Sequence, residues 1–362
     1  MKRLAFVGIL PVAALVLAAF FPLVNAEACT SMFWNTNGQA MLDGRNMDLG
    51  QNELPVFYVF PKGLAWSGGT FAKALAWTSD YGSLMVTGLN NRNVSAEGIN
   101  TAGLAFHSQY LRATQYEKRE DPPTPLTKPG VGHLTYGIYL LGKAATVAEA
   151  LALFYQAQVV LDPNYSDLPQ HYALRDASGD AAIIEFVGGK MNMYHGSQFN
   201  VLANDPPLPD MPDLMQYTWF GGNLPLPGDN ASSARFVRAS AFVGALNSPT
   251  HPLGTPLPII LFSAIRAMSE PWNSAQLYEN PPVFMACWPT LWTIVTDLTN
   301  KAVYFSHNLA RNNFWIDMNK LNFNTGAPVK SLNAQRTDLI GEVSGLFSSA
   351  PDGAISLLLF SD

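Results

Sequence analysis

One cysteine near the amino terminus combines two groups that acyl-transfer chemistry can use. Cys29 directly follows the small-residue triplet Ala26-Glu27-Ala28. A cut after Ala28 would give Cys29 both a thiol and a free α-amine. The thiol is a nucleophile, and the amine, with a pKa of about 8, is neutral often enough near pH 7 to accept the thiol proton. A lone cysteine is more often a small buried apolar residue, so the terminus alone leaves both interpretations open.

The segment ahead of Cys29 has the pattern of a cleavable secretory signal. A positively charged start precedes an almost wholly apolar run over 4–24, and small residues stand at the cleavage positions. We therefore expect residues 1–28 to be removed and residues 29–362 to form one domain, periplasmic or secreted, with no stable membrane anchor. Two alternatives stay open. The apolar run is long enough to be an uncleaved anchor, and a lipoprotein signal would also end at a cysteine, although it normally has an aliphatic residue where this chain has Ala26.

The chain just after Cys29 is typical of a hairpin. The stretch CTSMFWNTNGQAMLDGRNMD reads as two short strands around Asn37-Gly38, a strong turn signal, and it ends with Arg45 and Asp48. Such a pair, taken alone, is most often a solvated surface pair. The hairpin nevertheless indicates that the terminus belongs to a sheet.

The remaining pattern predicts strands, then two helices, then further strands and helices. Thr146 and Glu149 form a capping box that opens the second helix. The order favours an α+β domain of layered sheets and helices, in which the Pro-rich stretches are surface loops. The predicted strands cover 56–60, 84–87, 101–106, 172–175, 182–187, 199–203, 292–297 and 302–306, and the predicted helices cover 136–145, 146–156, 232–246 and 258–268.

Composition excludes several classes of protein. Of 362 residues 48% are apolar and 13% charged, which predicts a sizeable core rather than disorder. The net charge of −6 and the absence of a basic run argue against a nucleic-acid partner. Only Cys29 and Cys287 are present, so at most one disulfide can form, and no Cys/His spacing suggests a metal site. We expect no metal or organic cofactor, and we interpret Cys287 as a core thiol.

Five segments together resemble the choloylglycine hydrolase family of penicillin V acylases and conjugated bile salt hydrolases. They are CTSMFWNTNGQAMLDGRNMD, SAEGINTAGLAFH, VLANDPP, LPGDNASSARFVRA and WTIVTDLTNKAVYF with the later IDMNKLNF. The resemblance spans nearly the whole chain after residue 28. It implies an N-terminal-nucleophile hydrolase, with a four-layer αββα sandwich of two antiparallel sheets, that cleaves amides with an amino-terminal cysteine.

The resemblance also implies roles for five residues besides Cys29. Arg45 would favour the thiolate, and Asp48 would hold and orient the amine. Asn204 would donate its side-chain amide to the oxyanion, the backbone N–H of Ala105 would be the second donor, and Arg235 would complete the polar site. Relatives often carry Asn or Tyr at the position matched to Ala105, so this chain departs from the family there.

Pocket residues are less clearly marked. Met47, inside the site motif, is the weak candidate for an apolar acyl pocket, whereas three tryptophans that could join it, Trp34, Trp66 and Trp77, are more often core residues in strands. The histidines at 107, 133 and 195 have no metal-ligand spacing and are interpreted as ordinary loop or core residues.

The resemblance narrows the expected substrate to a small N-acyl amide. The signal and a short interval between Asn204 and Arg235 look more like the Gram-negative branch, which includes penicillin V acylase-like enzymes and acyl homoserine lactone acylases. Bile salt hydrolases have in that interval a hairpin that joins subunits, so the resemblance leaves a homo-oligomer open without implying their tetramer. We rank penicillin V and acyl homoserine lactones above conjugated bile salts. The alternative from another class is a non-catalytic periplasmic binding protein of the same fold, against which the retention of all the polar site residues argues.

Overall fold

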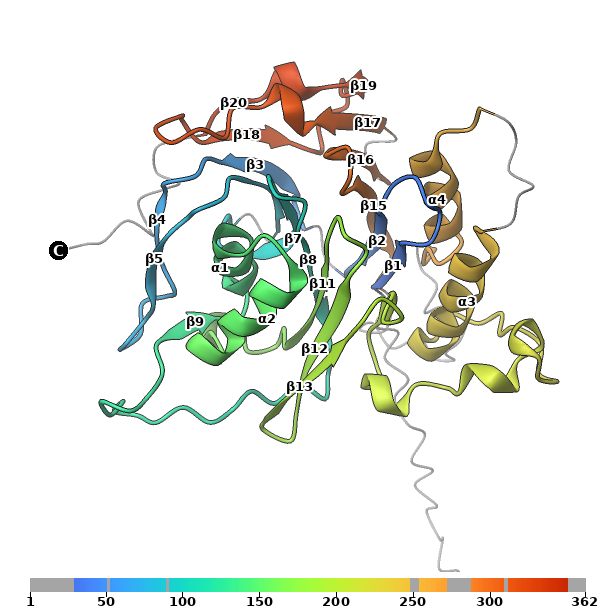
Figure 1. Ribbon diagram of the computed structural model, residues 1–362, viewed down its shortest axis with the longest axis horizontal. Helices are drawn as coiled ribbons and strands as arrows, with labels where there is room; N and C mark the ends of the chain where they lie inside the picture. The colour runs from blue at the N-terminus through green and yellow to red at the C-terminus, as the bar shows by residue number, and fades with distance from the viewer. Residues whose placement is uncertain are drawn as a thin grey trace, which may run out of the picture.

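Two β-sheets lie between two layers of helices in the part of the chain that the structure describes (Figure 1). This computed structural model describes residues 29–50, 53–88, 91–247, 254–271, 288–308 and 312–350. The expected four-layer αββα architecture is confirmed. None of the helices in these ranges has the length and apolar character that crossing a membrane requires.

The first sheet carries the amino-terminal hairpin next to its edge strand β14 (Val201–Ala203). Its neighbours are antiparallel except for the last pair, which is parallel. In order across the sheet, its strands are β14 (Val201–Ala203), β1 (Thr30–Trp34), β2 (Leu42–Asp48), β15 (Thr290–Asp297), β16 (Ala302–His307), β17 (Asn312–Asp317) and β19 (Gly341–Glu342).

The second sheet is antiparallel throughout. In order, its strands are β13 (Lys190–His195), β12 (Ala181–Val187), β11 (Gln170–Arg175), β8 (Ala105–Tyr110), β7 (Ser95–Asn100), β6 (Ser83–Thr87), β3 (Val56–Phe60), β18 (Lys330–Asn333) and β20 (Ser348–Ser349). Two small additional sheets pair β4 (Ala65–Ser67) with β5 (Ala76–Thr78) and β9 (Gly130–Gly132) with β10 (Gln158–Val160).

Each sheet has its own helix pair on its outer face. Helices α1 (Tyr136–Lys143) and α2 (Val147–Gln156) cover the second sheet, and α3 (Ser232–Ala245) and α4 (Leu257–Arg266) cover the first (Figure 1). The predicted cap of α2 is present, because Thr146 Oγ1 accepts a hydrogen bond from the Glu149 nitrogen at 3.2 Å. The Glu149 carboxylate accepts in return from the nitrogen of Ala145 at 2.8 Å.

Aromatic rings fill the space between the two sheets. Phe57 of β3 packs edge-to-face against Phe305 and Phe314 of the first sheet, with ring centroids 5.1 and 5.9 Å apart. Cys29 belongs to the same buried cluster. The nucleophile candidate therefore lies at the inter-sheet layer rather than beneath the helices.

The predicted hairpin forms as expected. β1 and β2 pair antiparallel, and the connection turns at Gly38, whose φ of +71° is easily reached only without a side chain. Asn37 Oδ1 stabilises the turn by accepting hydrogen bonds from the nitrogens of Gln39 and Ala40, each at 2.9 Å.

The prediction of one strand over 101–106 is wrong. That segment contains the turn between β7 and β8, and the second strand begins only at Ala105. The Asn100 side chain accepts hydrogen bonds from the nitrogens of Ala102 and Leu104, each at 3.0 Å, and Gly103 has a φ of +95°. An asparagine followed by a glycine three residues later is a turn signal that the apolar residues around it concealed.

Candidate active site

Strand pairing alone brings three of the expected residues together. Thr30 of β1 pairs with Ala203 of β14 on one side and with Asn46 of β2 on the other. The next position in each antiparallel ladder therefore places Asn204 and Met47 beside Cys29. Met47 Sδ lies 3.9 Å from Cys29 Sγ.

Asn204 contacts the nitrogen of Cys29. Its Oδ1 accepts a hydrogen bond from that nitrogen at 2.8 Å. Its Nδ2 is buried and, among the described residues, has no hydrogen-bond partner. A buried amide donor without a partner is costly unless something occupies it, so Asn204 keeps one unpaired donor on the same amide that binds the Cys29 nitrogen.

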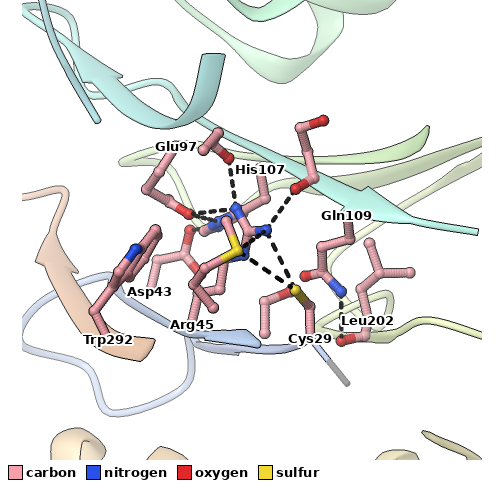
Figure 2. A network of polar contacts seen from close by, with 12 residues as sticks. Cys29, Asp43, Arg45, Glu97, His107, Gln109, Leu202 and Trp292 are labelled. Carbon is pink, nitrogen blue, oxygen red and sulfur yellow. Dashed lines mark hydrogen bonds and ion pairs between the residues drawn. The ribbon is translucent and has the colours of Figure 1, made fainter. Parts of the chain in front are cut away.

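Arg45 bridges the sulfur of Cys29 to the second sheet (Figure 2). Its Nη2 lies 3.6 Å from Cys29 Sγ and donates to the Ser108 carbonyl at 2.6 Å. Its Nη1 donates to the Ala96 carbonyl at 2.5 Å and lies 3.3 Å from Glu97 Oε2. Alternation along β2 explains the direction, because the neighbouring Asn46 faces α4 instead.

The thiol of Cys29 is neutral in its resting environment. Burial raises its pKa above the ordinary value, and the opposing effect of the Arg45 guanidinium is not large enough to reverse this. Arg45 thus acts in the expected direction without producing a resting thiolate. A base must take the proton when the thiol reacts.

The carboxylate of Asp48 does not contact the Cys29 nitrogen, which it was expected to hold. Its main-chain oxygen is 3.7 Å from Cys29 Sγ, but its carboxylate accepts a hydrogen bond from Thr290 and lies 3.7 Å from Arg235 Nη1. Burial raises the pKa of Asp48 well above its usual value, despite the nearby Arg235. Among the described residues the Cys29 nitrogen bonds to Asn204, not to Asp48.

Arg235 anchors the start of β1 from α3. Its Nη1 donates to the Cys29 carbonyl at 3.1 Å and to Thr30 Oγ1 at 2.8 Å. Its Nε lies 3.2 Å from Glu270 Oε1. The side chain is completely buried, so it is not the helix-surface charge that an isolated arginine usually is.

Ala105 does not line the space beside the sulfur. It lies in β8, opposite Ile99 on one side and Arg175 on the other. Among the described residues, Ser108 and Tyr110, further along the same strand, line that space instead. The expectation for Ala105 came from the resemblance alone, and the cavity lining among the described residues adds no support for it as an oxyanion donor.

A buried charge network that the sequence did not predict extends from Arg45. His107 Nδ1 lies 2.7 Å from Glu97 Oε2, and its Nε2 contacts Asp43, which also pairs with Arg175 (Figure 2). Burial alone would lower the pKa of His107, but the two carboxylates raise it. Asp43 could have been placed on the Arg45 face from strand alternation, whereas its partners come from distant segments.

A small, mostly apolar cavity adjoins the sulfur. Its volume is about 60 Å³. Met47 lines it, as expected for the weak pocket candidate, whereas Trp34, Trp66 and Trp77 belong to other parts of the core. The other lining residues include Leu49, Glu53, Val94, Leu134, Leu168 and Trp288.

The described residues contain one cysteine and no cluster of metal ligands. In those ranges no group of three or more His, Cys, Asp or Glu side chains is arranged to hold a metal ion. Cys29 is a free buried thiol. The interpretation of Cys287 falls outside the described residues.

The chain matches a family model over residues 29–212, that of linear amide C–N hydrolases of the choloylglycine hydrolase family. It is 31% identical to penicillin V acylase from Pectobacterium atrosepticum, over 90% of this chain and 89% of that protein.

Solved structures agree on the fold. Penicillin V acylase from Agrobacterium tumefaciens superposes with a TM-score of 0.77 at 30% identity, covering 89% of this chain and 98% of that one. A variant of conjugated bile acid hydrolase from Clostridium perfringens superposes with a TM-score of 0.69 at 19% identity, covering 86% and 98%. At 19% identity the second likeness concerns the fold alone.

Proposed function

Because the chain belongs to the choloylglycine hydrolase family of linear amide C–N hydrolases, we propose that Cys29 is its nucleophile once residues 1–28 have been removed. The observation that carries this proposal is the contact between Asn204 and the Cys29 nitrogen, beside a donor that has no partner among the described residues. The family match begins at Cys29 itself, which supports the same starting residue.

The proposed reaction proceeds through a thioester. The free α-amine of Cys29 takes the thiol proton, and the sulfur attacks the amide carbonyl carbon. Asn204 Nδ2 donates to the oxygen of the tetrahedral intermediate. The ammonium returns the proton to the leaving nitrogen, the C–N bond breaks, and an amine departs. Water then attacks the thioester with the amine again as base, which releases a carboxylic acid and restores the thiol.

The surrounding residues support this chemistry by position and charge. Arg45, 3.6 Å from the sulfur, stabilises negative charge there as the proton leaves. Arg235 holds the carbonyl of Cys29 and so orients the nitrogen. Asp48 pairs with Arg235 and therefore acts on Cys29 through that arginine and through its own main chain.

We propose a small apolar acyl group as the substrate's acyl part. The cavity beside the sulfur is mostly apolar, and burying a methylene in such a site contributes about 0.8 kcal/mol. Conjugated bile salts would require a much larger site. Penicillin V and acyl homoserine lactones therefore rank above them, and the name of the relative from Pectobacterium points the same way. The signal-like segment supports a periplasmic or secreted location.

The deciding experiment compares kcat/KM of the processed protein on penicillin V, glycine-conjugated bile salts and homoserine lactones of increasing acyl length. We expect cleavage of the first and third classes, unaffected by EDTA and abolished by thiol alkylation. Cys29→Ser is the matched control, because the amine is poorly matched to a hydroxyl proton.

Three results would count against the proposal. Near wild-type turnover by Cys29→Ser would remove the nucleophile assignment. A strong preference for bile salts would overturn the substrate ranking. Tight binding of these amides without turnover would favour the non-catalytic binding protein.

A further inference from the structure

Two acidic residues, Asp48 and Glu53, line the mostly apolar cavity beside Cys29. The Asp48 carboxylate is engaged by Thr290 and Arg235, which leaves Glu53 as the acidic residue of interest. Glu53 is only 3% exposed. Its Oε2 accepts a hydrogen bond from Trp292 Nε1 at 2.6 Å, whereas its Oε1 has no hydrogen-bond partner among the described residues. Glu53 and Cys29 line the same cavity, so an acyl group bound there beside the sulfur is within reach of this carboxyl.

The chain makes room for this carboxyl at Gly88. A Cβ built on Gly88 would lie 2.2 Å from Glu53 Oε1, far inside van der Waals contact. Any other residue there would displace the carboxyl. Gly88 therefore leaves space for Oε1, and the indole of Trp292 fixes Oε2 by its hydrogen bond.

The charge state of Glu53 depends on a few facing groups. The pKa of Glu53 is raised to about 7, mainly by burial and to a smaller extent by the charge of Glu97. The hydrogen bond from Trp292 and the charge of Arg45 oppose this rise. These groups come from β15, β2 and β7. Below this pH the carboxyl is neutral. Since Oε2 already accepts from the indole, the proton belongs on Oε1, where it is a donor with no partner among the described residues.

We propose that Glu53 is a specificity-determining residue that donates a hydrogen bond to an oxygen in the acyl part of the substrate. The favoured acyl groups carry an ether or keto oxygen within a few atoms of the scissile carbonyl, in an otherwise apolar chain. This inference rests on the proposed function, because it needs an acyl group in the cavity beside Cys29. An acyl group without such an oxygen leaves a buried donor unpaired, which disfavours it.

The test uses two p-nitroanilides that differ in one atom. One carries a phenoxyacetyl group and the other a 3-phenylpropanoyl group, in which a methylene replaces the ether oxygen. The ratio of their kcat/KM values is measured at pH 5.5 and pH 8.5 for the processed wild type, Glu53→Gln and Glu53→Leu. The ratio in Glu53→Leu sets the baseline, because the ether oxygen also activates the carbonyl chemically.

We expect the wild-type ratio to exceed that baseline about tenfold at pH 5.5 and to fall to it or below at pH 8.5, where the carboxylate no longer donates. Glu53→Gln should keep a raised ratio at both pH values, because its amide donates without titrating. Should Glu53→Leu fail to fold, the loss of pH dependence in Glu53→Gln decides the question.

Two outcomes would overturn the inference and are distinguishable from each other. If all three proteins cleave both anilides with the same ratio at both pH values, the role of Glu53 is refuted and the proposed function stands. If the processed wild type cleaves neither anilide nor the substrates named above, the proposed function falls and the role of Glu53 falls with it.

Discussion

Asn204 uses the two ends of its side-chain amide for different purposes beside Cys29. Oδ1 accepts a hydrogen bond from the Cys29 nitrogen at 2.8 Å, while Nδ2 is buried without a partner in the described structure. The acceptor fixes where the nitrogen points, and in the proposed reaction the donor would bind the oxygen of the intermediate. Under that proposal one residue would link the placement of the base to the stabilisation of the intermediate.

Asn204→Asp separates these two contributions, because it keeps an acceptor for the nitrogen and removes the donor. We expect kcat to fall by about 10² to 10³ with a much smaller change in KM, since the lost bond is made mainly in the transition state. Steady-state kinetics on the processed variant measure this. Activity within a factor of three of wild type would show that Asn204 Nδ2 does not bind the oxyanion.

A precursor that keeps Glu27 and Ala28 ahead of Cys29 should fold but have no activity, because its nitrogen is then a peptide amide that cannot accept a proton. A matched version with a protease site that cuts immediately before Cys29 should gain activity on digestion. Mass spectrometry of the amino terminus follows the cut. Hydrolysis by a homogeneous uncut precursor would exclude the α-amine as the base.

Arg45→Gln should slow alkylation of Cys29 by iodoacetamide at pH 8 by about ten- to a hundredfold, because the thiolate loses its facing positive charge. Arg45→Lys keeps the charge and should lose less. Both variants should react like wild type in denaturant, where the contact is absent. Equal rates in all three folded proteins would mean that Arg45 has no influence on the sulfur.

His107 should make stability depend on pH in a definite direction. Its pKa in the folded protein is raised above that of free histidine, about 6.5. Its charged form therefore stabilises the fold fully below that pH, and the contribution is lost as the pH rises through the folded-state pKa. Urea unfolding should show that His107→Asn lowers the free energy of unfolding more at pH 5.5 than at pH 9.

Two features make this comparison decisive. The cost of lost packing is the same at both pH values and cancels in the difference between them. His195→Asn is the control, because that side chain is half exposed, at 45%, and should change stability little at either pH. An equal loss at both pH values for His107→Asn would show that the imidazole between Glu97 and Asp43 is uncharged.

Local signals predicted most of the elements well. The turn at Gly38, the cap at Thr146 and the apolar runs of the four helices are determined by neighbouring residues, and all four predicted helices lie within two residues of the observed ends. The strand over 101–106 failed because the turn set by Asn100 was concealed between apolar residues. The expected oxyanion donor at Ala105 had a different source, the resemblance, and the cavity beside the sulfur is lined by other residues of β8.

Side-chain partners were harder to predict, because they depend on register between distant strands. The positions of Arg45 and Met47 were expected from the site motif, and alternation along β2 explains them in the structure, but the carboxylate of Asp48 accepts from Thr290 rather than from the amine. His107 gave no sign of its two carboxylate partners, which come from β2 and β7. Cleavage after Ala28 and the identity of the substrate remain predictions.

The pairing of β1 has a consequence for how the protein moves. Chain ends usually fray, and removal of residues 1–28 would turn Cys29 into a chain end. β1, however, lies between β14 and β2, and Arg235 ties the Cys29 carbonyl to α3. Releasing the amino terminus requires breaking the hydrogen bonds of β1 to both β14 and β2. The amide protons of residues 30–32 should therefore exchange with solvent only on global unfolding. The proposed nucleophile, at the new chain end, would then belong to the slowest-exchanging part of the protein.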